Sequence, residues 1–232
     1  MIKALLFDVD GTLIDSLDDL EIACNQLMQS LNLAPLSRDE VSRFIGKGAR
    51  ILVVRALNAR LGRTPTDEEI DQALRVYLRA MAEVDGRYSK LEPNVLEALE
   101  RLKKFHYPMA VVTNKPHSIA EALLSKFQIR HFFDTVIGAD DVTHPKPAPD
   151  MLLLAASKLN VTIEECAMIG DSMNDAQAAQ NAKAHPLLLR TGVNEGVSID
   201  DWTKIHLPLT PIFDTMEELS DYLKTHSGVN RE

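Results

Sequence analysis

The chain has 232 residues, of which 45% are hydrophobic and 25% charged, a composition typical of a globular protein with one sizeable core, or a core and a small second domain. Its formal net charge of -9 at pH 7 argues against a nucleic-acid or membrane partner, because a basic face does not survive such an excess of acids. The sequence contains no apolar run of transmembrane length and no signal-peptide pattern, so we expect a cytoplasmic protein.

Residues 2–7 form a short, mostly apolar run without helical spacing, which predicts a strand buried on both faces. The run ends in Asp8 and Asp10, and Gly11 then allows a sharp turn. Two neighbouring carboxylates are costly unless a cation compensates them, and a hard divalent cation such as Mg2+ suits carboxylate oxygens. The stretch therefore predicts a functional site. An acidic turn after a buried strand is the alternative interpretation.

Helical spacing replaces the strand pattern from Leu17 to about residue 84, and no strand signal interrupts it. Ser37 with Glu40, and Thr66 with Glu69, are capping boxes that predict helix starts within this block.

We expect the helical block to form a four-helix cap domain over residues 16–85, inserted at the ligand end of the sheet. Residues 1–15 and 86–232 would then form the core domain. The two connections, near Ser16 and over residues 85–93, would be hinges, because the second has the composition of a turn.

From Val95 onward, helix and strand patterns alternate. Helices are predicted over residues 95–104, 116–127 and 150–159. Two more are predicted, one that follows Asp175 and ends at Asn181 and one that begins at Thr215. Strands are predicted over 109–112, 135–138, 166–170 and 186–189. Such alternation predicts right-handed βαβ units, and hence an α/β fold with a Rossmann-like parallel sheet flanked by helices.

Polar residues with phosphate chemistry follow the predicted strands, where open α/β sheets bind ligands. They are Asp8 and Asp10, Thr113 and Asn114, Asp171 and Asp175, with Lys146 in a loop of the same class. Carboxylates for a metal, donors for an oxyanion and one cation match the needs of phosphoryl transfer. The alternatives are structural: Thr113 and Asn114 as a strand end, Lys146 as an exposed loop residue, and Asp175 as a helix-start acid.

Taken together, these motifs resemble the haloacid dehalogenase-like hydrolase superfamily. The resemblance rests on Asp8-Val9-Asp10-Gly11-Thr12, Thr113-Asn114, Lys146-Pro147, and Gly170-Asp171-Ser172 with Asp175, in the family's order. It implies the family's Rossmann-like core and small four-helix cap.

The resemblance also implies a mechanism. Asp8 would attack phosphorus and form an aspartyl-phosphate, and Asp10 would act as acid and then as base. Mg2+ would be held by Asp8, Asp171 and the backbone carbonyl of Asp10.

The remaining motif residues would bind or balance charge. Thr113 and backbone donors near Asn114 and Gly11 would grip the phosphoryl oxygens. Lys146 would balance charge on the nucleophile and the phosphoryl group, and Asp175 would orient Lys146 or a metal-bound water.

Within the superfamily, the chain most resembles the phosphoglycolate phosphatase branch, which makes 2-phosphoglycolate the expected substrate. The support is the run 113–116, the run 146–150 and Gly46-Lys47-Gly48 with Arg50, where Lys47 and Arg50 would hold a second anionic group. A solvated turn between helices is the alternative for this loop. Asn94, residues 184–186 and residues 200–211 depart from the branch's pattern.

The expected partner is therefore a small phosphorylated metabolite, bound by a monomer or a homodimer. A phosphosugar mutase of the same superfamily and a catalytically silent binding module are the rival interpretations. The intact charged set disfavours the silent module, and the presence of Asp10 disfavours a haloacid dehalogenase.

Overall fold

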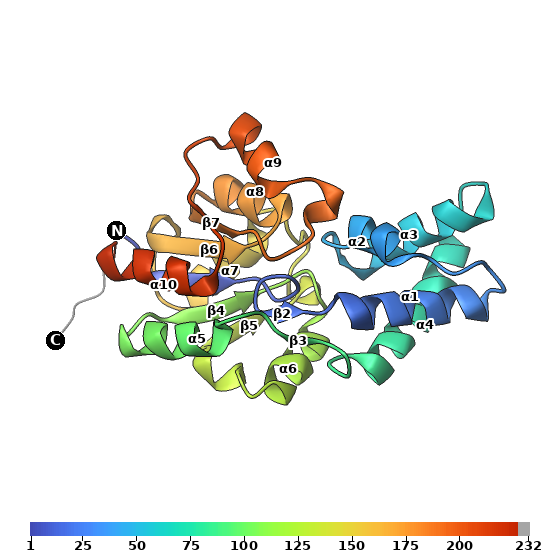
Figure 1. Cartoon of the computed structure of the whole chain (residues 1–232), viewed down its shortest axis with the longest axis horizontal. Helices are drawn as coiled ribbons and strands as arrows, with labels where there is room; N and C mark the ends of the chain where they lie inside the picture. Colours follow the sequence, from blue (N-terminus) through green and yellow to red (C-terminus); the bar gives the residue numbers. More distant parts are fainter. Residues whose placement is uncertain (227–232) are drawn as a thin grey trace.

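The computed structural model describes residues 1–226, and its centre is a parallel sheet in the strand order β5-β4-β1-β6-β7-β8 (Figure 1). The strands are β1 (Ala4–Phe7), β4 (Met109–Val112), β5 (Thr135–Ile137), β6 (Cys166–Gly170), β7 (His185–Leu189) and β8 (Ile212–Phe213). Leu5 pairs in register with Met109 on one side and with Ala167 on the other. The first strand of the chain is thus central in the sheet.

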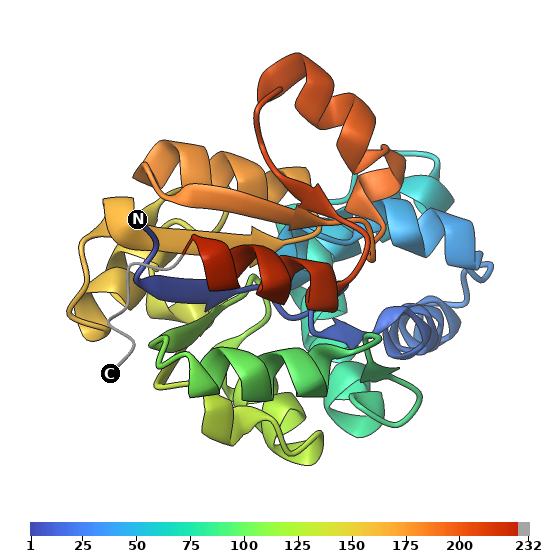
Figure 2. The same ribbon diagram turned by 60° about the vertical axis from the view of Figure 1, so that its left-hand side comes forward.

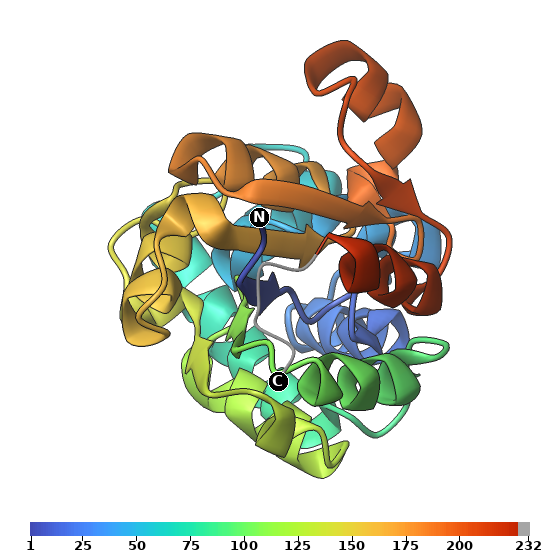
Figure 3. The same ribbon diagram turned by 90° about the vertical axis from the view of Figure 1, so that its left-hand side faces the viewer.

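Helices cover both faces of this sheet (Figures 2 and 3). Leu5 and Phe7 point into one apolar cluster, and Ala4 and Leu6 into another, which confirms that β1 is buried on both sides. The first face is covered by α5 (Val95–Lys104), α6 (His117–Lys126) and α10 (Met216–Thr225), and the second by α7 (Asp150–Lys158) and α8 (Met173–Ala182). The predicted α/β fold is therefore present.

Helices α1–α4 pack together beside the sheet and bury their own apolar cluster (Figure 1). They are α1 (Leu17–Ser30), α2 (Arg38–Phe44), α3 (Gly48–Leu61) and α4 (Asp67–Val84). Both predicted capping boxes, at Ser37 and at Thr66, are formed. We call α1–α4 the helical body; that it acts as a separate cap domain stays a prediction.

The two connections to the helical body form a small antiparallel ribbon, β2 (Ile14–Asp15) with β3 (Lys90–Leu91). The sequence predicted a segment of turn composition over residues 85–93 and no strand between Gly11 and Ser16, so both strands of this ribbon were missed. Strands of two residues are too short to show the alternation of apolar and polar residues that predicts a strand, so the sequence pattern does not reveal them.

Further differences lie in short or late elements. The helix α9 (Ile199–His206), which projects from the rest in Figures 2 and 3, was not predicted. Thr162 with Glu165 has the sequence spacing of a further capping box, but the Thr162 hydroxyl donates to the Glu165 carboxylate and caps no backbone N–H of the 3-10 turn that follows. The other 3-10 turns are η1 (Arg130–Phe132), η2 (Ala139–Asp141) and η4 (Asn194–Gly196), besides η3 (Ile163–Glu165). No helix within residues 1–226 combines the length and apolar character needed to cross a membrane.

Candidate active site

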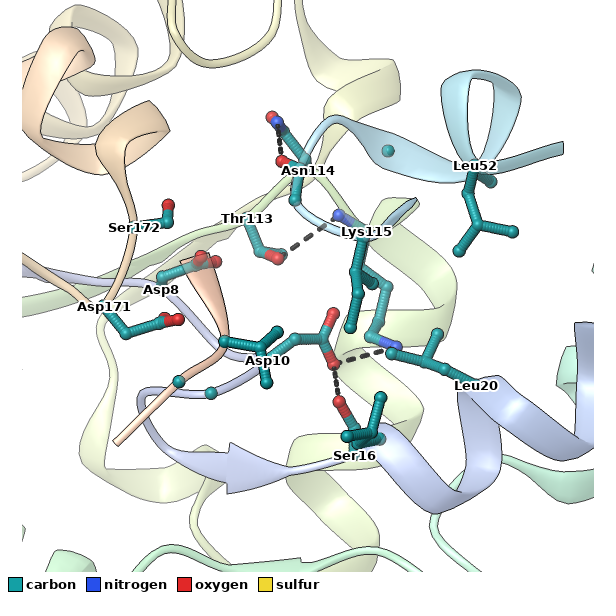
Figure 4. Close-up of a pocket in the computed structure, with 18 of the residues that line it drawn as sticks. Asp8, Asp10, Ser16, Leu20, Leu52, Thr113, Asn114, Lys115, Asp171 and Ser172 are labelled. Carbon is teal, nitrogen blue, oxygen red and sulfur yellow. Dashed lines mark hydrogen bonds and ion pairs between the residues drawn. The ribbon is translucent and has the colours of Figure 1, made fainter. Parts of the chain in front are cut away.

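The sheet topology brings the motif residues to one edge. Strands β4, β1 and β6 are neighbours, so Thr113, Asp8 and Asp171 follow three adjacent strands at their carboxyl ends. All three line one cavity between this edge and the helical body. The cavity has an empty volume of ≈ 1020 Å³, including space open to solvent. Figure 4 shows their side chains at this cavity, with Leu20 and Leu52 of the helical body also on its wall.

Three carboxylates meet at this edge of the sheet, and two of them, Asp8 and Asp171, line the cavity. Ligand oxygens of Asp8, Asp171 and Asp175 lie within 4.8 Å of one another. Burial, with the nearby Asp175 and Asp10 carboxylates, raises the pKa of Asp8 to about 7 against the opposing effect of Lys146. Burial, with the nearby Asp175 and Asp8 carboxylates, holds the pKa of Asp171 well above its usual range. A crowded set of oxygen donors with surplus negative charge fits a hard cation such as Mg2+.

The acid cluster differs in one member from the predicted metal ligands. Asp175, which we expected to orient Lys146 or a metal-bound water and not to bind the metal, lies within the cluster. The Asp10 side chain lies outside it. The Asp10 prediction concerned its backbone carbonyl, which this cluster of side chains does not test.

Glycines leave the room that the carboxylates occupy. A Cβ on Gly192 would lie 1.6 Å from Asp171 Oδ2, and one on Gly170 would lie 2.3 Å from Asp175 Oδ2. Gly11 has a φ of +82°, and its Cβ would meet Asp171 Oδ2 at 2.7 Å. Close packing, as well as the turn at Gly11, therefore requires glycine around the cluster.

Lys146 is buried and is not an exposed loop residue. Its Nζ lies 3.0 Å from Asp8 Oδ1 and 2.7 Å from Asp175 Oδ1, and it donates to the Val112 carbonyl at 2.8 Å. Burial alone would lower the pKa of Lys146, but the Asp175 and Asp8 carboxylates outweigh it and raise the pKa. The ammonium group therefore stays charged against the predicted nucleophile.

Asp175 serves two purposes that the sequence offered as alternatives. Its Oδ2 accepts from the Ser172 backbone and hydroxyl in a capping box that opens α8. Its Oδ1 accepts from Lys146 Nζ. A helix-start acid and a partner of Lys146 are thus the same residue.

Asp10 faces the cavity with a different set of partners. Ser16 Oγ donates to Asp10 Oδ1 at 2.6 Å, and Lys115 Nζ lies 3.3 Å from that oxygen (Figure 4). Lys115 also lies 3.4 Å from Asp85 Oδ1. Burial alone would lower the pKa of Lys115, but the Asp10 and Asp85 carboxylates raise it.

The two residues that follow β4 have unequal positions. Thr113 is buried at the cavity wall, where its hydroxyl accepts from the Lys115 backbone N–H. The Asn114 side chain donates to the carbonyls of Gly46, at 3.0 Å, and Lys146, at 2.9 Å. It therefore joins the helical body to the sheet edge; the phosphate role predicted for backbone donors near Asn114 stays a prediction.

Lys47 and Arg50 form ion pairs with residues outside the acid cluster. Lys47 Nζ lies 3.6 Å from Glu195 Oε1, beside the cavity, and Glu195 also pairs with Arg55 at 2.5 Å. Arg50 pairs with Asp71 on the exposed side of the helical body.

Sequence reasoning gave no role to several residues that contact the predicted ones. Lys115 directly follows Thr113 and Asn114, so its place after a strand was an available signal. The sequence placed Ser16 and Asp85 only in the predicted hinges, and Gly192 and Glu195 in no motif. Folding brings three of these residues into contact with the predicted ones and Asp85 into contact with Lys115.

Comparisons with known proteins agree with one another. The family model for haloacid dehalogenase-like hydrolase matches residues 5–188. The phosphoglycolate phosphatase of Psychrobacter arcticus is 37% identical over 95% of this chain and 95% of its own length, and that of Escherichia coli K12 is 35% identical over 86% and 85%. A crystal structure described as a predicted phosphoglycolate phosphatase from Haemophilus somnus 129PT superposes with a TM-score of 0.87 at 32% identity, covering 97% of this chain and 98% of that one.

Proposed function

Because this chain belongs to the haloacid dehalogenase-like hydrolase family, in its phosphoglycolate phosphatase-like branch, we propose that it hydrolyses 2-phosphoglycolate with Mg2+ through an aspartyl-phosphate intermediate. The family makes the chain a phosphoric monoester hydrolase; the substrate, the ion and the intermediate are our proposal. The observation that supports it most is the surroundings of Asp8. This carboxylate has the Lys146 ammonium 3.0 Å away and belongs to the acid cluster with Asp171 and Asp175.

The chemistry would proceed in two halves. In the first, an Asp8 carboxylate oxygen bonds to phosphorus as the ester P–O bond breaks, and Asp10 gives a proton to the leaving alkoxide. In the second, Asp10 takes a proton from water, whose oxygen attacks phosphorus and releases Asp8 and inorganic phosphate. The position of Asp10 at the cavity, two residues after Asp8, supports both roles.

Positive charge at the reacting phosphoryl group would come from two sources. Asp8, Asp171 and the Asp10 carbonyl would hold Mg2+, which when bound offsets the repulsion between the nucleophile and the phosphate. Lys146 supplies the other charge. Asp175 orients Lys146 through the 2.7 Å contact between Oδ1 and Nζ.

Hydrogen-bond donors would complete the phosphate site. The Thr113 hydroxyl and backbone N–H groups near Asn114 and Gly11 would bind the phosphoryl oxygens. Residues 16–85 would act as a cap domain over the cavity. Lys47, close to the cavity-lining Glu195, would bind the substrate carboxylate; the position of Arg50 gives no support for the same role. We further propose that the protein acts on this metabolite in the cytoplasm.

The test is phosphate release from a panel of small phosphate esters, with and without Mg2+. We expect Mg2+-dependent turnover that is most efficient for 2-phosphoglycolate, and no turnover by Asp8→Asn, whose circular dichroism spectrum should match that of the wild type. Conversion of a hexose 1-phosphate to its isomer without free phosphate would favour the mutase. An absence of turnover on the whole panel would favour a binding module.

The substrate carboxylate has its own test in Lys47→Ala. This variant should lose more kcat/KM for 2-phosphoglycolate than for p-nitrophenyl phosphate, which has no carboxylate. Equal losses would remove Lys47 from the substrate site.

A further inference from the structure

Lys115 is a buried cation that the proposed mechanism leaves without a role. Its side chain is 5% exposed, and its Nζ lies between two carboxylates, 3.3 Å from Asp10 Oδ1 and 3.4 Å from Asp85 Oδ1. An ammonium group removed from water needs such partners to remain charged. The three groups therefore fix one another's positions.

Both donors to Asp10 use the same oxygen. Ser16 Oγ and Lys115 Nζ each lie against Oδ1, as Figure 4 shows. For Oδ2 of Asp10, residues 1–226 provide no hydrogen-bonding partner. A carboxyl group with one oxygen held by two donors presents its other oxygen to the cavity in a set direction, which proton transfer requires.

The partners of Asp10 come from separate parts of the fold. Ser16 is the residue before α1, Asp85 is the residue after α4, and Lys115 follows β4 by three positions. The Asp85 side chain is 9% exposed, and the backbone carbonyl of Asp85 accepts a hydrogen bond from Lys126 Nζ at 2.9 Å. Both ends of the helical body thus reach Asp10, one of them through Lys115.

We propose that Lys115 is a positioning residue for proton transfer by Asp10, held in place by Asp85. The inference rests on the proposed function. Asp10 Oδ2 delivers the proton to the leaving oxygen while the Asp8–phosphorus bond forms and the ester bond breaks. Lys115 transfers no proton itself; it keeps Oδ1 in place so that Oδ2 faces the leaving group.

The leaving group separates this role from a merely structural one. Phenyl phosphate and p-nitrophenyl phosphate have similar shapes, but their leaving groups differ in basicity. Nitrophenolate is a weak base and leaves without a proton, whereas the more basic phenolate depends on a proton from the general acid. Lys115→Met should therefore lower kcat/KM for phenyl phosphate about a hundredfold, the usual size of a general-acid contribution, and for p-nitrophenyl phosphate by less than about tenfold. The ratio of the two kcat/KM values is the readout.

Lys126→Met is the matched control, since Lys126 contacts the Asp85 carbonyl and not Asp10. It should leave the ratio at the wild-type value. Should Lys115→Met not fold, Asp85→Asn tests the same arrangement and should shift the ratio in the same direction by a smaller factor. An unchanged ratio in whichever of these two variants folds overturns the inference.

Phosphate release by the wild-type protein distinguishes a failure of this inference from a failure of the proposed function. Mg2+-dependent release of phosphate from both aryl esters by the wild type, with none by Asp8→Asn, keeps the proposed function whatever the ratio does. A wild type that releases no phosphate overturns the proposed function, and the inference with it.

Discussion

The position of the Asp171 carboxylate depends on glycine at residue 192. The backbone of Gly192 packs so closely on Asp171 that any side chain would overlap its carboxylate. The same steric argument applies between Gly170 and Asp175. The acid cluster is thus shaped by the absence of side chains as much as by the carboxylates themselves.

Gly192→Ala should therefore displace Asp171. The new Cβ would lie 1.6 Å from Oδ2, and the carboxylate or the backbone has to move. Loss of ligand orientation of this kind usually costs about ten- to a hundredfold in metal affinity or activity. Steady-state kinetics across a Mg2+ titration measures it. Gly62→Ala in the helical body is the control: its φ of +64° strains an alanine locally, but no atom beyond its chain neighbours lies within 4 Å of the new Cβ. A wild-type Mg2+ response in Gly192→Ala would contradict the prediction.

The surplus negative charge of the acid cluster predicts a second outcome. Asp171→Asn removes one of three crowded carboxylates, and the other two, Asp8 and Asp175, pair with the Lys146 ammonium. It should therefore raise the melting temperature of the metal-free protein at neutral pH by a few degrees. It should also abolish the rise in melting temperature that Mg2+ gives to the wild type. Calorimetry with EDTA and with Mg2+ provides both values.

The exposed Asp67 supplies the comparison for that experiment, since its side chain is 95% exposed. Asp67→Asn should keep the full Mg2+ response. A Mg2+ response retained by Asp171→Asn would place the metal elsewhere.

Among the elements, the ribbon β2–β3 is followed directly by an acidic residue whose pKa is raised. Glu92 follows β3 at the cavity, where burial and the Asp15 carboxylate, opposed by Lys90, raise the pKa of Glu92 to about 7. The unfolded chain releases this proton near 4.5, so between about pH 4.5 and 7 the native state binds more protons. This carboxyl group therefore makes the protein less stable as pH rises through that window.

Glu92→Gln should remove this loss. Its free energy of unfolding should exceed that of the wild type by about 1 kcal/mol at pH 7, and the gap should close as pH falls to 4.5. Urea unfolding at the two pH values gives the difference. A gap that stays constant with pH would show that Glu92 ionises normally in the native state.

At the scale of the whole molecule, Glu195 connects the sheet edge to the helical body. Its carboxylate pairs with Arg55 at 2.5 Å and Lys47 at 3.6 Å, and it accepts from Asn174 Nδ2 at 3.1 Å. Arg55 in turn donates to the Phe44 carbonyl at the end of α2. The side chain is 8% exposed, so this contact is shielded from solvent and stronger than a surface pair.

Glu195→Gln should loosen the helical body from the sheet edge. Amide hydrogen exchange in α2 (Arg38–Phe44) should accelerate several-fold, with β1 and β6 unchanged, because only the contact between the two parts is weakened. Glu121→Gln is the control, since the Glu121 pair with Arg130 lies within the α/β part. Equal exchange in both variants would mean that Glu195 does not hold α2.

The sequence allowed the sheet and the acids at its edge to be predicted because both are local signals. Buried strands show as apolar runs, and Asp8, Thr113 and Asp171 each stand just after one. Lys115 was visible in the same way, but its partner Asp85 lies 30 positions away and is joined to it only by folding. Short strands such as β2 and β3 leave no periodic signal at all.

The pairing of β2 with β3 has a consequence for recombination between relatives. The chain enters and leaves the helical body through one ribbon, in which Ile14 faces Leu91 and Asp15 faces Lys90. Chimaeras spliced at these two pairs would exchange the whole insert and keep the backbone pairing that holds the junction. The fold thus offers a crossover point at which the helical body can be exchanged while the sheet edge and its acid cluster are kept.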